Sequence, residues 1–185
     1  MEDNWLADFL PLIDPDYPLL ELGCGEGKDT DWLTSRGYEL ICLDISSKWA
    51  REAWHLRACP SVQADLSSGL PLRTHSFSCI LASLSLHYFS WATSMAVLKD
   101  LRRVLCPDGN LIVRLNSVND SNFGAGQGEV IEPNYYLADD RYKRFFSRDD
   151  IQRLFDGWQL SALQEVETRR WNKPKMAWQF SATPV

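Results

Sequence analysis

The nine residues 19–27, Leu-Leu-Glu-Leu-Gly-Cys-Gly-Glu-Gly, constrain the fold of this chain more than any other stretch. The apolar first half predicts a short buried strand. Gly23, Gly25 and Gly27 follow, and glycine lets a backbone turn sharply and leaves room for a ligand. Residues 28–36 predict a helix whose first N–H groups point back at the turn. The stretch therefore predicts a strand, a ligand-binding turn and a helix in succession.

The glycine spacing differs from the dinucleotide-binding fingerprint G-x-G-x-x-G. Counted from Gly23, the fingerprint needs glycine where this chain has Lys28, and counted from Gly25 it needs glycine where the chain has Thr30. The chain also lacks the Tyr-x-x-x-Lys pair of short-chain dehydrogenases. A nicotinamide-dependent oxidoreductase is therefore disfavoured, and an ordinary tight turn in some other α/β protein stays open.

Further apolar segments follow the first strand, separated by segments with helical patterning. This alternation indicates an α/β fold, a parallel sheet with helices on both faces. In such sheets ligands bind at the carboxyl ends of the strands. That places residues 21–27, Asp44, Asp65, residues 83–88 and Asn116 along one edge. The expected strands are 39–44, 61–63, 77–83 and 111–115, and the expected helices are 4–12, 46–57 and 91–105.

The C-terminal third of the chain has a different residue composition from the part before it. Residues 117–144 are polar and contain several glycines, and a loop of this length in a compact domain is usually functional or disordered. Ser147 and Asp150 match a capping box that begins a helix. Two strands are expected near 158–166 and 175–182, and the connection at 171–174 is short enough to make them antiparallel neighbours.

Composition narrows the function classes. A length of 185 residues predicts one domain, and the net charge of −6 disfavours sequence-independent binding of nucleic acid. No apolar run reaches the roughly 20 residues of a membrane span, and the acidic N-terminus does not match a signal peptide. The five cysteines are widely spaced, which predicts neither a disulfide framework nor a metal site. A cytoplasmic protein with no membrane partner is expected.

The acid and alternating glycines, Glu21-x-Gly-x-Gly-x-Gly, resemble the first motif of the class I S-adenosylmethionine (SAM)-dependent methyltransferases. The resemblance covers residues 18–116. It implies a three-layer Rossmann-like sandwich, with a mostly parallel seven-stranded sheet, an antiparallel C-terminal hairpin and helices on both faces. The expected single domain comprises an N-terminal helix at 1–17, a cofactor-binding core at 18–116, a substrate-covering loop at 117–146, and a C-terminal helix and hairpin at 147–185.

The same resemblance implies a SAM site. Glu21 would hold the methionine amine, Asp44 the two ribose hydroxyls and Asp65 the adenine amino group. Each acid also has a simpler interpretation, since Asp44 can be a solvated strand-end acid or a helix cap and Asp65 an ordinary turn residue. At the start of the strand expected at 77–83, this family often has Phe-Asp, whereas the chain has Phe77-Ser78. The implied cofactor-binding residues are Glu21, Gly23, Cys24, Gly25, Asp44, Ile45, Asp65, Leu66 and Ser83.

Five residues are candidates for binding the methyl acceptor, and one is a candidate for catalysis. His87 follows the fourth strand and is the candidate general base, because the ordinary pKa of histidine suits proton removal near neutral pH. Alternatively, His87 forms part of the wall beside the cofactor. Arg114 lies within an apolar strand, where a charge needs a partner; it either pairs with the protein or reaches an anionic substrate. The candidate substrate-binding residues are Tyr88, Arg114, Asn116, Tyr135 and Tyr136.

These observations predict a SAM-dependent methyltransferase that uses in-line displacement on a small-molecule acceptor and releases S-adenosylhomocysteine (SAH). The net negative charge and the absence of an added recognition domain favour a small molecule over a nucleic acid as the methyl acceptor. A non-catalytic SAM-binding module and a protein methyltransferase stay open as alternatives. The chain is expected to be a monomer or a homodimer.

Overall fold

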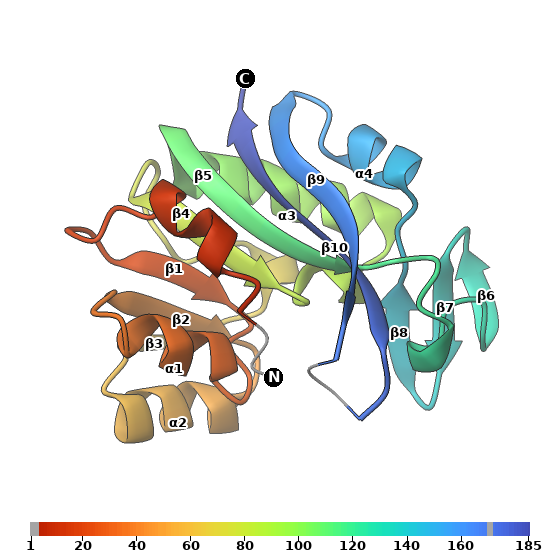
Figure 1. Ribbon diagram of the computed structural model, residues 1–185, viewed down its shortest axis with the longest axis horizontal. Helices are drawn as coiled ribbons and strands as arrows, with labels where there is room; N and C mark the ends of the chain where they lie inside the picture. Colours follow the sequence, from red (N-terminus) through yellow and green to blue (C-terminus); the bar gives the residue numbers. More distant parts are fainter. Residues whose placement is uncertain (1–3, 170–171) are drawn as a thin grey trace.

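A seven-stranded sheet organises the computed structural model, which describes residues 4–169 and 172–185 (Figure 1). The strand order is β3-β2-β1-β4-β5-β10-β9. Strands β1 to β5 pair in parallel, whereas β10 runs antiparallel to both β5 and β9. The strands are β1 (Leu19–Leu22), β2 (Leu40–Asp44), β3 (Ser61–Gln63), β4 (Phe77–Ser83), β5 (Leu105–Asn116), β9 (Trp158–Thr168) and β10 (Lys175–Pro184).

Helices cover both faces of this sheet, which confirms the predicted three-layer α/β fold (Figure 1). One apolar core lies under η1, α1 and α2, and the other lies under α3 and α4. No helix in the described ranges has both the length and the apolar character that a bilayer crossing requires. The helices are η1 (Ala7–Leu12), α1 (Lys28–Thr34), α2 (Ser47–Arg57), η2 (Leu66–Ser68), η3 (Leu86–Tyr88), α3 (Trp91–Val104), η4 (Ser121–Phe123) and α4 (Arg148–Leu154).

Serine residues begin three of the α-helices. Ser46 accepts from the Trp49 N–H at the start of α2, and Ser90 accepts from the Thr93 N–H at the start of α3. Ser147 forms the predicted capping box at α4, where its hydroxyl and the carboxylate three residues later each accept a backbone N–H. An N-cap of this kind contributes about 1 kcal/mol, so local sequence fixes where these helices start.

The N-terminal segment is helical but of a different type from the one expected. Residues 7–12 form the 3-10 helix η1, with Pro11 inside it. Proline has no N–H to donate, which disfavours a continuous α-helical ladder. Trp5 and Phe9 are buried against the sheet, with ring centroids 5.8 Å apart. Part of the predicted N-terminal segment, residues 1–3, lies outside the described residues. The same is true of Trp171 in the expected hairpin connection.

The segment expected as a long loop at 117–146 contains a second sheet, so that part of the prediction is wrong. Its strands β6 (Glu129–Glu132), β7 (Tyr135–Ala138) and β8 (Arg141–Arg144) pair antiparallel in sequence order. Asp139 and Asp140 both have positive φ in the two-residue turn between β7 and β8, a conformation that Asp tolerates and that suits a hairpin. In Figure 1 this small sheet lies beyond the end of β5, where the chain leaves the main sheet.

Strand β5 begins earlier than the expected 111–115. Leu105 pairs with Phe77, and the next pairing joins Asn110 to Cys79. Four residues of β5 therefore loop out opposite one residue of β4, which places the Pro107-Asp108-Gly109 turn in a bulge. The bulge leaves the pairing of Leu111 to Arg114 with β4 intact, so the carboxyl end of β5 lies where the sequence predicted it.

Candidate active site

The glycine turn after β1 is held tightly against its neighbours. Gly23 has φ +67°, and a Cβ on it would lie 2.8 Å from the Cβ of Ser85. Gly27 has φ +73°, and a Cβ there would lie 2.3 Å from Nε of Arg57. The Gly23 N–H donates to the Leu43 carbonyl at 2.6 Å. Only glycine satisfies both the positive φ and the close approach at these positions.

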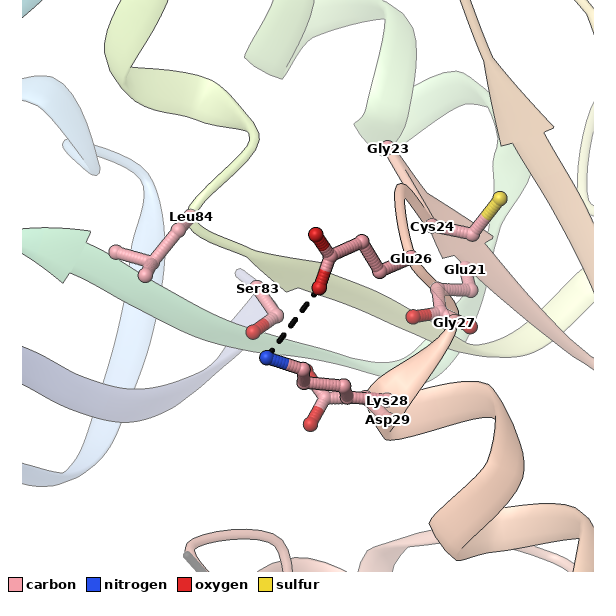
Figure 2. A pocket seen from close by; sticks show the side chains of 9 residues that line it. All are labelled: Glu21, Gly23, Cys24, Glu26, Gly27, Lys28, Asp29, Ser83 and Leu84. Atoms are coloured by element: carbon pink, nitrogen blue, oxygen red, sulfur yellow. Dashed lines mark ion pairs between the residues drawn. The ribbon is translucent and has the colours of Figure 1, made fainter. Parts of the chain in front are cut away.

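A small pocket, the turn pocket, lies against this turn (Figure 2). Its volume is about 170 Å³, and Glu21, Cys24 and Ser83 are among the residues that line it. The Glu21 side chain is almost fully buried, and its Oε2 accepts from the Thr30 hydroxyl at 2.5 Å. Figure 2 also shows the ion pair between Lys28 and Glu26, 3.3 Å long, at this pocket. A buried carboxylate beside a pocket suits a cationic group of a ligand.

A larger pocket, the cleft, adjoins the turn pocket, since Gly23 and Leu84 line both. Its volume is about 450 Å³. Ile45 is 65% exposed and Tyr88 is 49% exposed, although both are large side chains of the cleft. Exposed apolar surface of this kind inside a pocket is typical of a ligand site. The predicted residues that line the cleft are Gly23, Gly25, Asp44, Ile45, Asp65, Leu66 and Tyr88.

Asp44 connects the cleft to the glycine turn. Its Oδ2 accepts from the Gly25 N–H at 2.9 Å, and its Oδ1 accepts from the Ser46 N–H at 2.8 Å. A carboxylate oxygen can accept two hydrogen bonds. Each oxygen of this buried carboxylate therefore keeps one acceptor position, which gives a pair of acceptors suited to a vicinal diol.

Asp65 is a turn residue that also lines the cleft. It caps η2 by accepting from the Ser67 N–H at 2.8 Å, and it lines the cleft. The hydroxyl and then the N–H of Ser67 lower the pKa of this carboxyl below its usual value. Asp65 is therefore ionised near neutral pH and can accept a hydrogen bond from a ligand in the cleft.

Two residues at the junction of the pockets belong to the segment 83–88 that the sequence placed at the ligand edge, but neither was predicted as a site residue. Leu84 has φ +55°, a strained conformation for leucine, and it lines both pockets. The buried Ser85 hydroxyl has no hydrogen-bond partner among the described residues. Strained backbone and unpaired buried polar groups gather at functional sites. Neither residue type carries a sequence signal for such a role, because backbone strain and a missing hydrogen-bond partner are visible only in the folded chain.

His87 is buried at 4% exposure, and its Nδ1 has no hydrogen-bond partner in the described part of the chain. Burial lowers the pKa of His87 well below its usual value, and the charges of Lys175 and Lys143 lower it further. The imidazole is therefore neutral at pH 7, and the lowered pKa makes it a weaker base than an ordinary histidine. His87 lines neither the turn pocket nor the cleft, although its ring lies 4.1 Å from that of Tyr88, which lines the cleft.

Asn116 ends β5 and is buried at 1% exposure. Within the described ranges, neither its amide nitrogen nor its amide oxygen has a hydrogen-bond partner. A buried amide without partners is costly, so this side chain is suited to bind a ligand or an ordered water.

Arg114 is fully buried but is held by the protein. Its guanidinium lies 5.1 Å from the centroid of the Trp5 ring. When the Gln179 amide is oriented to satisfy its neighbours, its oxygen accepts from Nη2 and Nε of Arg114 at 3.1 and 3.3 Å. These contacts match the structural alternative considered for Arg114 rather than direct contact with a substrate.

A third pocket, the sheet pocket, lies between η4 and the small sheet and has a volume of about 480 Å³. Phe123, Tyr136 and Phe145 provide aromatic walls, and Arg141 and Lys143 provide two cations. Of the two predicted tyrosines, Tyr136 lines this pocket. Tyr135 is instead buried, with its hydroxyl donating to the Tyr88 carbonyl at 3.0 Å. The small sheet therefore contacts η3 directly, next to the cleft.

Comparison with known sequences gives one family. The family described as "Methyltransferase domain" matches residues 20–113. The uncharacterized methyltransferase YodH of Bacillus subtilis is 37% identical over 103 residues, 53% of this chain and 42% of the relative. The tRNA N(3)-cytidine methyltransferase METTL2 of Xenopus tropicalis is 26% identical over 168 residues, 83% of this chain and 50% of the relative. This chain spans half or less of the length of these curated relatives.

Solved structures share the fold at low identity. A SAM-dependent methyltransferase from Methanosarcina mazei has a TM-score of 0.82 at 19% identity, with 97% of each chain covered. The 1,6-didemethyltoxoflavin-N1-methyltransferase of Burkholderia thailandensis, solved with its substrate and SAH, has a TM-score of 0.68 at 19% identity, with 92% of this chain and 72% of that chain covered. At this identity the likeness shows the fold.

Proposed function

This chain belongs to the SAM-dependent methyltransferase family, and we propose that it transfers the methyl group of SAM to a small-molecule acceptor. The observation that carries the proposal is the pair of adjoining pockets at the glycine turn. Glu21 lies in the turn pocket and Asp44 in the cleft, and both are buried carboxylates.

The chemistry of the pockets fits the groups of SAM. Glu21 suits the cationic amine, and the two free acceptor positions of Asp44 suit the ribose hydroxyls. Asp65 would accept from the adenine amino group. The apolar side chains of Ile45 and Leu66 would pack on the adenine faces. Gly23, Gly25, Cys24 and Ser83 would form the remaining walls.

Bound SAM supplies a methyl group that its sulfonium already activates. The chain itself must align the acceptor and exclude water. Alignment of reactants can supply about 7–11 kcal/mol, whereas a general base adds about 10²–10⁴-fold. The burial of His87 and Asn116 supports alignment, because η3 contacts both β8 and β5 and both side chains are held in place.

His87 is the proposed proton acceptor when the attacking atom carries a proton. Its lowered pKa keeps the imidazole neutral, and the unpartnered Nδ1 is the atom that would receive the proton. Asn116, with both amide atoms unpartnered, would orient the acceptor through hydrogen bonds. The nearby charges of Lys175 and Lys143 disfavour a lasting imidazolium, so the proton would pass on to water after transfer.

The sheet pocket is the proposed acceptor site. Its volume of about 480 Å³ lies in the range of roughly 300–1,000 Å³ found for small-molecule sites. Aromatic walls favour a planar molecule, and Arg141 and Lys143 favour an acidic group on it. Tyr136, which lines the sheet pocket, and Tyr88, which lines the cleft, are the tyrosines proposed to contact the acceptor.

A tRNA acceptor is the second candidate, because the tRNA methyltransferase of Xenopus tropicalis matches 83% of this chain. The net charge of −6 weighs against it, since phosphate contacts need clustered Lys and Arg.

One experiment separates the two acceptors. SAH release would be measured with a panel of planar acids, their neutral amides and unmodified tRNA. The proposal predicts turnover with members of the acidic set, and Tyr136→Ala is expected to raise KM more than it lowers kcat. Turnover with tRNA alone would replace the small-molecule proposal, and no turnover with tight SAM binding would favour a non-catalytic module.

A further inference from the structure

Two buried cysteines lie in contact beneath the glycine turn. Sγ of Cys42, in β2, lies 2.9 Å from Sγ of Cys59, which follows α2. An S–S bond is about 2.0 Å long, so bond formation needs a displacement of less than about an ångström. Both thiols are free and buried. The described residues contain no group of His, Cys, Asp and Glu arranged to hold a metal ion, so metal binding does not account for this pair.

Cys59 lies at a separate opening in the surface. It lines the back pocket, of about 390 Å³, together with Leu40, Arg57 and Pro60. No residue of the back pocket lines the turn pocket or the cleft. A small reagent in the back pocket therefore lies next to the buried Cys59 without passing through the cofactor site.

The thiols differ in reactivity. The hydrogen bond with Cys42 lowers the pKa of Cys59. The hydrogen bond with Cys42 and then burial raise the pKa of Cys24, and burial raises that of Cys79 to about 12. Because the thiolate is the nucleophile, Cys59 is expected to react first among these buried cysteines.

We propose that Cys59 is a site of oxidation by small peroxides and that it then forms a disulfide with Cys42. The Cys59 thiolate attacks one peroxide oxygen; the O–O bond breaks, and the released hydroxide takes a proton to become water. The Cys42 sulfur then attacks the sulfenic sulfur, the S–O bond breaks, and the leaving hydroxide takes the Cys42 proton. With hydrogen peroxide, two thiols and one peroxide thus give one disulfide and two waters, with two electrons passing to the peroxide.

The disulfide would act on the cofactor site through Cys42. Its Sγ lies 3.9 Å from Oε2 of Glu21 and 3.8 Å from the hydroxyl of Thr30, which donates to the same Oε2. Cys42 has one S–H, which can donate to Glu21 or to Cys59, and a bond to Cys59 removes it. A thiol is a weak hydrogen-bond donor, and this contact is 3.9 Å long, so SAM affinity should fall on the order of threefold to tenfold. This second step rests on the proposed function, whereas disulfide formation does not.

The first test is a peptide map of the full chain under non-reducing conditions, after treatment with hydrogen peroxide. It should contain one linked peptide pair, Cys42 with Cys59, that a dithiol reductant separates. Cys79→Ala is the matched control, because Cys79 is buried but has no thiol partner, and it should leave the linked pair intact. A linkage of Cys24 with Cys42, or no linkage while other thiols are oxidised, would overturn the proposal.

The second test is calorimetric titration with SAH before oxidation, after oxidation and after re-reduction. Affinity should fall and then recover, and Cys59→Ser should abolish the change. Unchanged affinity in protein that carries the linked pair would overturn the coupling to Glu21. Reduced protein that binds no SAH would count against the proposed function instead, and the peptide map would still decide the disulfide.

Discussion

Replacement of Asp44 by alanine should weaken cofactor binding more than any other single change in the cleft. The carboxylate has one free acceptor position on each oxygen, because each already accepts one backbone N–H. A hydrogen bond to a charged group contributes about 1.5–3 kcal/mol, so two ribose contacts contribute about 3–6 kcal/mol. The dissociation constant for SAM should therefore rise about 10²–10⁴-fold.

Calorimetric titration with SAM and SAH measures this change, with folding checked by urea denaturation. Asp14→Ala is the matched control, because Asp14 also accepts a backbone N–H two residues later, at 3.0 Å, but is exposed and lines none of the pockets described above. It should bind SAM as the wild type does. A loss of less than about tenfold, roughly 1.4 kcal/mol, in folded Asp44→Ala protein would refute the assignment of the ribose to Asp44.

The remaining predictions concern the turn, the buried histidine and the last helix. Gly23→Ala should weaken SAH binding in calorimetry, because the added Cβ would meet Ser85. Gly37→Ala is the control, since Gly37 has φ +86° but open space around it. It should bind SAH normally and lower only the unfolding free energy, by the backbone strain of about 1–2 kcal/mol. Because the pKa of His87 is lowered in the folded chain, the unfolded chain binds a proton that the folded chain does not. The unfolding free energy should therefore fall as the pH drops below about 6.5, by up to ~1.4 kcal/mol per pH unit. The variant His87→Gln should lose that part of the pH dependence in urea titrations. Ser147→Ala should lower the unfolding free energy by about 1 kcal/mol in the same assay, because α4 loses its capping box, and an unchanged value would contradict that role.

The sequence carried strong local signals for the first two thirds of the fold. Strands 61–63 and 77–83 match β3 and β4, and Ser46 begins α2 as expected. These elements have apolar runs or caps, which act over a few residues. The acids that end the predicted strands, Asp44 above all, consequently fall in one cleft.

What the sequence did not reveal depends on contacts between distant residues. Each strand of the small sheet has only four residues, and β6 and β8 are largely exposed, so the segment lacks the apolar alternation by which strands are recognised. The contact of Cys42 with Cys59 arises from the pairing of β2 with β3 and has no spacing signature. The strain at Leu84 and the unpaired amide of Asn116 likewise arise from tertiary packing.

The central claim, that the glycine turn and the cleft form one SAM site, is tested most directly by a crystal structure of the protein with SAH. The account predicts the ribose hydroxyls on Asp44, the amine beside Glu21 and the adenine between Ile45 and Leu66. SAH bound in the sheet pocket or the back pocket, with the cleft empty, would contradict it.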